Sequence, residues 1–335
     1  MVTVKDIAKA SGVSPSTVSI ILNGKSQARK ISDKTCQKVW DAVRTLGYQP
    51  NIAARTLRDG HGGGTRTIAL FWANDFRTSM LSRFLKGLES VRDTSGVENE
   101  IVVFTYANDQ LCRQSALLSG KRFHAAIIAN ASEKDMEFID SVVFPMPVVL
   151  YNRQSPGYYS VTVDNEKMGR LAAEAFITRG RRHPWIITSA DVFPGMSLRI
   201  DGFTETLKTG GIASGPEQLR TADNSLESGA AIMHEILASG QPCDSVFCLS
   251  DAIAHGVLYE LHRSGKKIPE DISVISIGNG DSEYSQFSIP PLTNVYLPME
   301  EMAAHCLTIL QNLLEHEDIP QRNMILDTPL ILRES

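Results

Sequence analysis

Short apolar runs alternate with amphipathic segments from Thr67 to the end of the chain, and this alternation constrains the fold more than any other feature. The segment from Asn165 to Arg179, for example, repeats its apolar residues at helical spacing between two such runs. Strands that alternate with helices form parallel sheets. The pattern therefore predicts an α/β core with parallel sheets. The predicted strands are Ile68–Trp72, Ile101–Tyr106, Ala125–Ala129, Val148–Tyr151, Trp185–Thr188, Val246–Leu249 and Val274–Ile277.

The first 49 residues have a different pattern, which predicts three short helices. A first helix ends at Gly12, and a second begins with Ser14 as its N-cap and Pro15 at its first helical position. After a polar loop, Ser32 caps a third helix. The inward stripe of this third helix is predicted as Cys36, Val39, Trp40, Val43 and Leu46. Two helices joined by a short turn that contains glycine are typical of a helix-turn-helix.

Charge is distributed unevenly between these two parts. Residues 1–60 carry ten lysines and arginines against four aspartates, a balance of +6. The whole chain has a formal net charge of −5, which leaves −11 for the remainder. A basic head on an acidic body is typical of a protein that contacts a polyanion with one end.

The string from Val4 to Ser19 (VKDIAKASGVSPSTVS), followed by Leu22-Asn23-Gly24, resembles the signature of the lactose-repressor/galactose-repressor (LacI/GalR) family. The resemblance implies an all-α helix-turn-helix head and a two-lobed core like that of periplasmic binding proteins, with parallel sheets. Landmarks in the core are similar to the family as well: Val163-Asp164-Asn165, Arg199 to Phe203, Cys248 to Asp251, Ile268 to Ile275, and Pro291-Leu292-Thr293 with Pro298 and Met299.

Three domains follow from the resemblance. We expect the DNA-binding head at 1–49, a hinge helix and linker at 50–66, and an effector-binding and dimerisation core at 67–335. Within the core, the N-lobe comprises 67–161 with 290–321, and the C-lobe comprises 162–289 with 322–335. The expected crossovers between the lobes lie near residues 161, 290 and 322.

By position, the resemblance places Pro15, Ser16 and Ile20 against base edges. Ile20 departs from the family, because many relatives have arginine or another polar donor there, whereas isoleucine offers only apolar contact, such as with a thymine methyl group. The remaining expected contacts of the head, to phosphates or within the turn, are Thr3, Ser14, Thr17, Ser19, Asn23 and Arg29.

The segment after the third helix is the expected hinge. Asn51 can cap a short run that ends at Leu57, and such a run is marginal as an isolated helix. The resemblance implies that it orders on the operator, pairs with its dimer mate in the minor groove and inserts Leu57 between base pairs. Asn51, Ala53, Ala54 and Leu57 are the expected minor-groove contacts. A linker with an incidental leucine is the alternative.

Effector-binding residues are expected in the loops after the strands, because ligands of such folds bind beyond the carboxyl ends of strands. For Arg199 we favour ligand contact over an ion pair that stabilises a lobe, whereas Asp251 suits either role. Gly278 stands where relatives often have an effector-binding aspartate, and whether Asp281 replaces it is open. The candidates are Trp72, Asn74, Asp75, Arg77, Asp164, Phe193, Arg199, Asn224, Asp251, Asn279 and Asp281.

A sugar or sugar derivative is the favoured effector. Trp72 offers a stacking face, and Asn, Asp and Arg side chains suit vicinal hydroxyls. A nucleoside or a protein co-regulator is the alternative. Repression is favoured over activation, and whether the effector induces or corepresses is open, as is the operator sequence.

Two other classes of protein agree less well with the sequence. An enzyme is disfavoured because the chain contains no G-x-S-x-G, H-E-x-x-H or complete Walker motif. A transported-sugar binding protein shares the core, but the basic head and an N-terminus without a signal-peptide pattern argue against export, so a cytoplasmic location is expected. The five cysteines form no C-x-x-C pair, which disfavours a disulfide framework and a metal site at Cys243 and Cys248. No cofactor is expected.

The expected partners are operator DNA and a second copy of the chain. One recognition helix reads only a few base pairs, so a homodimer on a pseudopalindromic operator is predicted. The segment Leu330 to Ser335 contains no leucine heptads, and a tetramer of the lactose-repressor type is not expected. No run approaches the length of a membrane span, so no membrane partner is expected.

Overall fold

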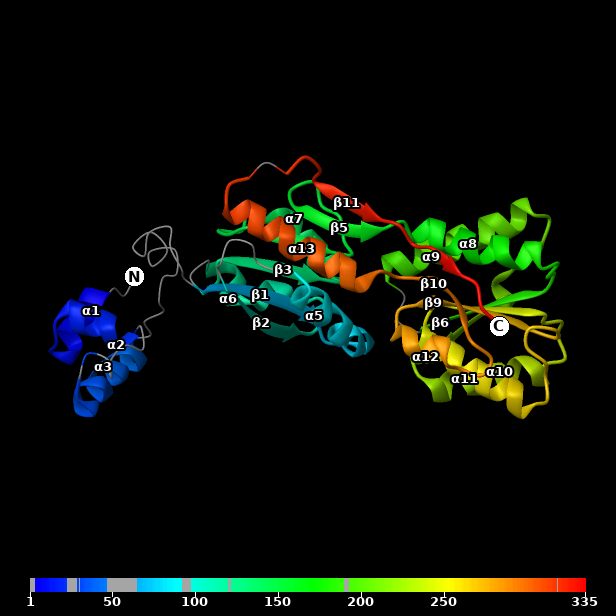
Figure 1. The fold of residues 1–335 in the computed structure, drawn as a ribbon, viewed down its shortest axis with the longest axis horizontal. Helices are drawn as coiled ribbons and strands as arrows, with labels where there is room; N and C mark the ends of the chain where they lie inside the picture. Colours follow the sequence, from blue (N-terminus) through cyan, green and yellow to red (C-terminus); the bar gives the residue numbers. More distant parts are fainter. Residues whose placement is uncertain are drawn as a thin grey trace.

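The computed structural model describes residues 4–22, 29, 31–46, 65–91, 98–119, 122–189, 193–317 and 319–335. Within these residues, no helix combines the length and apolar character needed to cross a membrane. Three helices form the head: α1 (Val4–Ser11), α2 (Pro15–Leu22) and α3 (Asp33–Leu46). The rest of the described chain forms two α/β lobes (Figure 1).

The head folds around a small apolar core to which each helix contributes. Ile7 from α1, Val18 from α2 and Val39 from α3 are fully buried against one another. Gly12 follows α1 with a φ of 70°, a conformation that glycine adopts without steric cost. The N-cap prediction is confirmed, because the Ser14 hydroxyl accepts a hydrogen bond of 3.1 Å from the amide of Thr17.

One part of the predicted stripe on α3 is wrong. Trp40 and Leu46 are exposed, whereas Cys36, Val39 and Val43 do face the other helices. The helices α1 and α2 are only eight residues long each. They therefore cover a narrow stripe of the longer α3, and residues beside that stripe stay in contact with solvent.

The N-lobe is built on six parallel strands in the order β11-β5-β4-β3-β1-β2, with helices on both faces. Successive residues of β1 point to opposite faces: Ile68, Leu70 and Trp72 pack towards α5 and α13, whereas Phe71 packs with α6 and α7. Both faces of the strand are therefore buried. The bounds are β1 (Arg66–Ala73), η1 (Phe76–Met80), α5 (Leu81–Glu89), β2 (Asn99–Tyr106), η2 (Leu111–Arg113), α6 (Ser115–Ser119), β3 (Ala125–Ala129), α7 (Glu133–Ser141), β4 (Val148–Tyr151), β5 (Tyr159–Val163), α13 (Met299–Leu314) and β11 (Asn323–Leu326).

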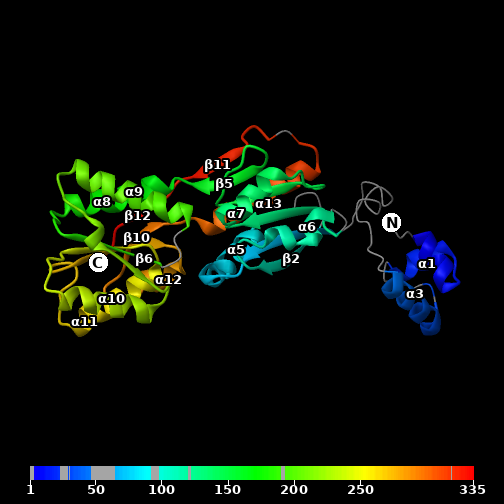
Figure 2. The same ribbon diagram turned by 180° about the vertical axis from the view of Figure 1, so that it is seen from behind.

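The C-lobe has a second six-stranded sheet in the order β12-β10-β9-β8-β6-β7, in which only β12 runs antiparallel to its neighbour. Both views place α8 and α9 along one side of the lobe and α10 and α11 along the other (Figure 1 and Figure 2). The predicted parallel α/β architecture is confirmed. The bounds are α8 (Asn165–Thr178), β6 (Pro184–Ser189), α9 (Pro194–Thr209), η3 (Pro216–Gln218), β7 (Leu219–Ala222), α10 (Leu226–Ala238), β8 (Ser245–Cys248), α11 (Asp251–Arg263), β9 (Ser273–Gly278), α12 (Ser282–Gln286), β10 (Thr293–Tyr296) and β12 (Leu330–Ile331).

The helices α8 and α9 approach each other closely because glycines lie where they cross. A Cβ atom on Gly169 would lie 1.9 Å from the carbonyl oxygen of Arg199, and one on Gly202 would lie 2.1 Å from that of Glu166. Any side chain at either position would push the helices apart. This contact sets the position of the first turns of α9, which carry Arg199.

The chain passes between the lobes near the predicted position at the first crossover and later than predicted at the other two. The first passage follows β5, which ends at Val163. The second lies between β10 of the C-lobe and α13 of the N-lobe, after residue 296 rather than near 290. The third lies between β11 and β12, after residue 326 rather than near 322. The second and third boundaries move because β10 and β11 each pair with one sheet before the chain crosses.

Candidate functional site

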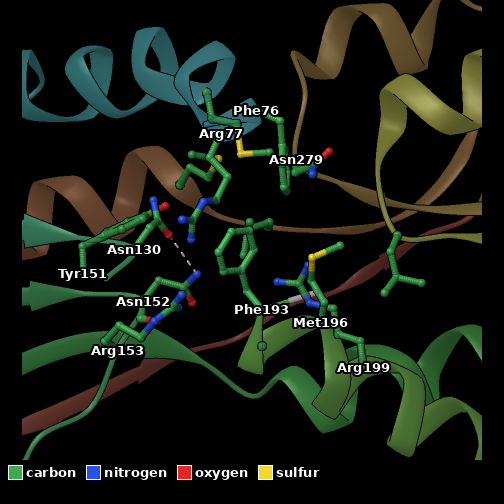
Figure 3. A pocket seen from close by; sticks show the side chains of 15 residues that line it. Phe76, Arg77, Asn130, Tyr151, Asn152, Arg153, Phe193, Met196, Arg199 and Asn279 are labelled. Atoms are coloured by element: carbon green, nitrogen blue, oxygen red, sulfur yellow. Dashed lines mark hydrogen bonds between the residues drawn. The ribbon is translucent and has the colours of Figure 1, made fainter. Parts of the chain in front are cut away.

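A cleft lies between the two lobes (Figure 3). Both lobes contribute to its walls. The lining residues are Phe76, Arg77, Met80, Asn130, Tyr151, Asn152, Arg153, Phe193, Gly195, Met196, Arg199, Leu249, Asn279, Leu297 and Met299.

Several of these residues directly follow the carboxyl ends of parallel strands. Asn130 follows β3 and Asn152 follows β4 in the N-lobe, and Asn279 follows β9 in the C-lobe. Asn130 and Asn152 have φ values of 56° and 58°, in the left-handed region that asparagine tolerates better than most residues. The Asn152 amide donates to Asn130 Oδ1 at 3.2 Å (Figure 3). The strand ends thus present a cluster of amides to the cleft.

Arg77 is the first of three arginines in the lining. Its Nε lies 2.9 Å from Asp75 Oδ1, and its guanidinium lies over the ring of Phe193, with 3.7 Å between Cζ and the centroid. Burial alone would raise the pKa of Asp75, but hydrogen bonds and charge from Arg77 bring that pKa below its usual value. Asp75 is therefore the ionised partner of Arg77, and it lies behind the cleft wall.

Arg199 and Arg153 are bound differently. Arg199 is 6% exposed, and among the described residues its hydrogen-bond partner is Asn165, whose Oδ1 accepts from Nε at 2.9 Å. Arg153 donates to the carbonyl oxygens of Ala131 and Asn152, while its third nitrogen, Nη2, is buried without a partner among the described residues. Burial lowers the pKa of each guanidinium to about 10.

Arg77, Phe193, Arg199 and Asn279, expected from the sequence to contact an effector, all line the cleft. Trp72 does not. Its side chain is fully buried in the N-lobe, 5.3 Å from Phe84 and 6.3 Å from Tyr151 between ring centroids. The expected stacking on a ligand is corrected, because residue 72 is still inside β1 and faces α5 and α13 rather than the strand end.

Four other candidates lie outside the lining. Asp164 caps α8 by accepting from the Lys167 amide at 2.8 Å, and Asp281 caps α12 by accepting from the Glu283 amide at 3.0 Å. Asn74 is exposed beyond β1, where it accepts a hydrogen bond of 3.4 Å from Thr78. Asn224 lies in the connection between β7 and α10. These four residues therefore do not line the cleft in this structure, and their expected ligand contacts stay predictions.

Asp251 has a structural role in this arrangement. It is buried at the start of α11, where Ser276 donates to Oδ1 and the Gly280 amide donates to Oδ2 at 3.0 Å. Its own amide donates to Asn279 Oδ1 at 3.1 Å. Burial raises the pKa of Asp251 despite these hydrogen bonds. The carboxyl group holds the loop after β9 and so orients Asn279 at the cleft.

Asn130, Asn152 and Arg153 line the cleft but were not among the residues expected from the sequence to contact an effector. A signal was present, because these residues directly follow the strands Ala125–Ala129 and Val148–Tyr151, which were predicted with their observed bounds. The rule that ligands bind beyond strand ends points to them. It does not say which polar residue after a strand turns into the cleft.

In the head, Ser14, Pro15 and Ser16 are exposed at the start of α2. Ile20 is half-buried and is not part of the head core, whereas the adjacent Ile21 is. Ser16 and Ile20 are four residues apart and so share an outward face of α2. Thr17 and Ser19 are half-buried and Arg29 is exposed. The expected contacts Thr3, Asn23, Asn51, Ala53, Ala54 and Leu57 lie outside the described residues.

Comparison with protein-family models gives two matches. Residues 3–51 match the model of bacterial regulatory proteins of the lacI family, and residues 173–335 match a periplasmic binding protein-like domain. The HTH-type transcriptional repressor PurR of Erwinia tasmaniensis is 30% identical over 317 residues, covering 92% of this chain and 89% of the relative.

Solved structures are similar as well. A LacI family transcription regulator from Clostridium acetobutylicum has 34% identity and a TM-score of 0.77, covering 81% of this chain and 100% of that one. The transcriptional regulator CelR, in complex with cellobiose, has 25% identity and a TM-score of 0.69, covering all of both chains.

Proposed function

The chain belongs to the LacI family of bacterial regulatory proteins, and on that premise we propose that it represses transcription under the control of a small molecule bound between its lobes. Its relatives are DNA-binding repressors, so the chain is a regulator and not an enzyme. The observation that carries the proposal is the cleft, because its walls come from both lobes. A ligand that contacts both walls binds one angle between the lobes more tightly than another, and therefore shifts the population of conformations.

The head supports the DNA-binding half of the proposal. Ser14 holds the first turn of α2, and Ser16 and Ile20 lie on the side away from the head core. A helix presented in this way reads base edges in the major groove. Ile20 adds an apolar contact, which favours a thymine methyl group over a hydrogen-bonding edge.

The reading of bases by α2 is tested by the substitution Ile20→Arg. We expect it to change which half-site is preferred, because contacts to base edges specify sequence and contacts to phosphates do not. Selection from a random DNA library with both proteins measures this. The same consensus sequence from both would contradict the assignment of Ile20.

The hinge contacts remain part of the proposal, since Leu57 lies outside the described residues. If Leu57 wedges between base pairs, Leu57→Ala should weaken operator binding by about tenfold or more and leave binding to random DNA nearly unchanged. Fluorescence anisotropy on both duplexes at one salt concentration measures the two affinities. An equal loss of affinity for the operator and for random DNA would mean that Leu57 is only part of a linker.

A homodimer is the proposed assembly. Large apolar side chains of the C-lobe are exposed on α11 and on the segment that includes and follows α12, namely Tyr259, Tyr284, Phe287 and Ile289. Apolar surface of this kind marks a contact with another protein. A second copy is the proposed occupant, because two heads are needed to read a pseudopalindromic operator.

This assembly is tested by Phe287→Asp, which places a charge on the proposed contact surface. Sedimentation should change from dimer to monomer, whereas Val143→Asp, at another exposed apolar residue, in the N-lobe, should leave the dimer intact. A dimer that survives the Phe287 substitution would place the contact surface elsewhere.

A sugar derivative is the proposed effector. Asn130, Asn152 and Asn279 offer amide donors and acceptors to the cleft. Phe76 and Phe193, whose ring centroids are 5.9 Å apart, add apolar surface to its lining. Such a mixture suits a polyol ring. The test is operator binding by the purified protein during titration with sugars, sugar derivatives and nucleosides. At least one sugar derivative should change the operator affinity, and a response only to nucleosides would reject this class.

A further inference from the structure

The cleft contains more positive charge than its surroundings neutralise. Its described lining includes Arg77, Arg153 and Arg199 and contains neither aspartate nor glutamate. Asp75 neutralises Arg77 from behind the wall, and the Asn108 amide occupies the same carboxylate at 3.0 Å. Among the described residues, Arg153 and Arg199 have no carboxylate within ion-pair distance.

Unpaired charges of this kind are costly inside a protein. Removing a guanidinium from water is unfavourable unless a counter-charge or a complete set of hydrogen bonds replaces the water. Arginine does not escape this cost by losing its proton, because its pKa stays well above neutral pH even where burial lowers it to about 10. The positive charges of Arg77 and Arg199 add to the effect of burial on Arg153.

The three guanidinium groups reach the cleft from different elements (Figure 3). Arg77 comes from η1 and Arg153 from the end of β4, both in the N-lobe, whereas Arg199 comes from α9 in the C-lobe. Two carbonyl oxygens hold Nε and Nη1 of Arg153, which fixes the plane of its guanidinium and leaves Nη2 buried without a partner. Arg153 therefore has a fixed donor that lacks an acceptor.

We propose that the effector carries an oxyanion, a phosphate or carboxylate group, which Arg153 and Arg199 bind from opposite lobes. The proposal rests on the proposed function and deepens it by naming the class of ligand: a polyol with one phosphate or carboxylate group, such as a sugar phosphate or a sugar acid. A guanidinium donates two parallel hydrogen bonds to such an oxyanion, and these are among the strongest hydrogen bonds in proteins. The amides of Asn130, Asn152 and Asn279 remain for the hydroxyl groups.

This arrangement also couples binding to the angle between the lobes. Without a ligand, Arg199 of the C-lobe shares the cleft with the like charge of Arg153 in the N-lobe, and the repulsion between them opposes approach of the lobes. An anion between them converts the repulsion into attraction from both sides. The oxyanion therefore stabilises the closed angle more than an uncharged ligand of the same shape does.

The first experiment uses inorganic phosphate as the probe with the full-length protein. Phosphate should raise the midpoint of thermal unfolding above that in chloride at the same ionic strength, because it binds the folded state. The shift should disappear in Arg153→Gln and in Arg199→Gln. It should persist in Arg182→Gln, which removes an exposed arginine of the C-lobe. Circular dichroism confirms that each variant is folded.

The second experiment separates the sources of the anion. Calorimetric titration with glucose, glucose 6-phosphate and gluconate compares one polyol without charge, with phosphate and with carboxylate. At least one charged compound should bind about tenfold or more tightly than glucose, since hydrogen bonds to a charged group are stronger than those between neutral groups. The advantage should be lost in Arg199→Gln, and the tighter of the two charged compounds identifies the oxyanion.

Two results would overturn the inference. One is a phosphate-induced shift that persists in both arginine variants, which would place the anion elsewhere. The other is glucose binding as tightly as both charged compounds. In either case, operator binding that still responds to an uncharged sugar would leave the proposed function intact. Failure to select any DNA site would reject the proposed function while leaving the anion titrations valid.

Discussion

The two lobes meet in two regions, and the arginines of these regions differ in whether a carboxylate neutralises their charge. In the first, Arg83 of α5 donates to the carbonyl oxygens of Gly278 (3.2 Å), Gly280 (2.9 Å) and Leu297 (3.1 Å), and its Nε donates to Glu300 at 2.8 Å. In the second, the cleft, Arg153 and Arg199 lack carboxylate partners among the described residues. Both regions bury guanidinium groups between the same lobes.

The difference indicates which region stabilises the fold and which is suited to bind a ligand. Hydrogen bonds and the charge of Glu300 raise the pKa of Arg83 despite its burial, whereas burial lowers the pKa of Arg199 with little compensation. Arg83 therefore links the lobes before any ligand binds. The cleft arginines contribute to binding at the expense of stability, a trade-off typical of functional sites. Three substitutions test this contrast.

The largest effect is expected for Arg83→Met. The change leaves Glu300 and three carbonyl groups without their donor, and breaking a buried ion pair in this way costs about 3 kcal/mol. Urea unfolding of the protein without ligand measures the change in the free energy of unfolding. Arg113→Met, at an exposed arginine of the N-lobe, serves as the control and should change stability by less than about 0.5 kcal/mol. If Arg83→Met changes the free energy of unfolding as little as Arg113→Met does, the contrast between the two regions fails.

A smaller effect, with a defined pH dependence, is expected for Glu300→Gln. Burial alone would raise the pKa of Glu300, but hydrogen bonds and charge from Arg83 lower this pKa below its usual value. A carboxyl group with a lowered folded pKa stabilises the protein above the unfolded pKa, and this contribution is lost as pH falls through the folded pKa.

We therefore expect Glu300→Gln to lower the free energy of unfolding by about 1 kcal/mol at pH 7, since Glu300 remains partly exposed. The difference from wild type should shrink as the pH is lowered from 4.5. Urea unfolding at a series of pH values measures it. A difference that stays constant down to pH 3 would mean that the charge of Glu300 is not what Arg83 requires.

The smallest effect is expected for Arg199→Met without ligand. The substitution removes an unpaired buried charge and keeps much of the side-chain volume, so stability should stay within about 1 kcal/mol of wild type or increase. Thermal and urea unfolding measure this. A loss as large as that of Arg83→Met would assign Arg199 to the fold, and the cleft arginines would then not differ in kind from Arg83.

Much of the fold follows from local sequence. The helices of the head were predictable because caps, glycine stops and apolar spacing act within a few residues, as Ser14, Pro15 and Gly12 illustrate. The strands β3 and β4 were predictable because both of their faces are buried, which requires continuous apolar runs. The α/β architecture follows from the alternation of such runs with helices.

The shorter strands were not predictable in this way. The strand β7 (Leu219–Ala222) contains Arg220 and Thr221, and β11 (Asn323–Leu326) is only partly buried. Strands at the edge of a sheet need one neighbour and bury less surface, so no apolar run marks them. The predicted crossovers near residues 290 and 322 were misplaced because β10 and β11 escaped detection.

The elements whose stability comes from neighbours along the chain follow from the sequence alone. The sequence also predicts that a ligand binds at polar residues after the strands. Which of those residues share the cleft depends on the tertiary structure. Trp72 and Arg77 are five residues apart, yet one is in the core and the other in the cleft wall. Arg153 and Arg199, from opposite lobes, line the same space. The shortage of counter-charge depends on every group around the cleft, and those groups are brought together by packing between segments far apart in the chain.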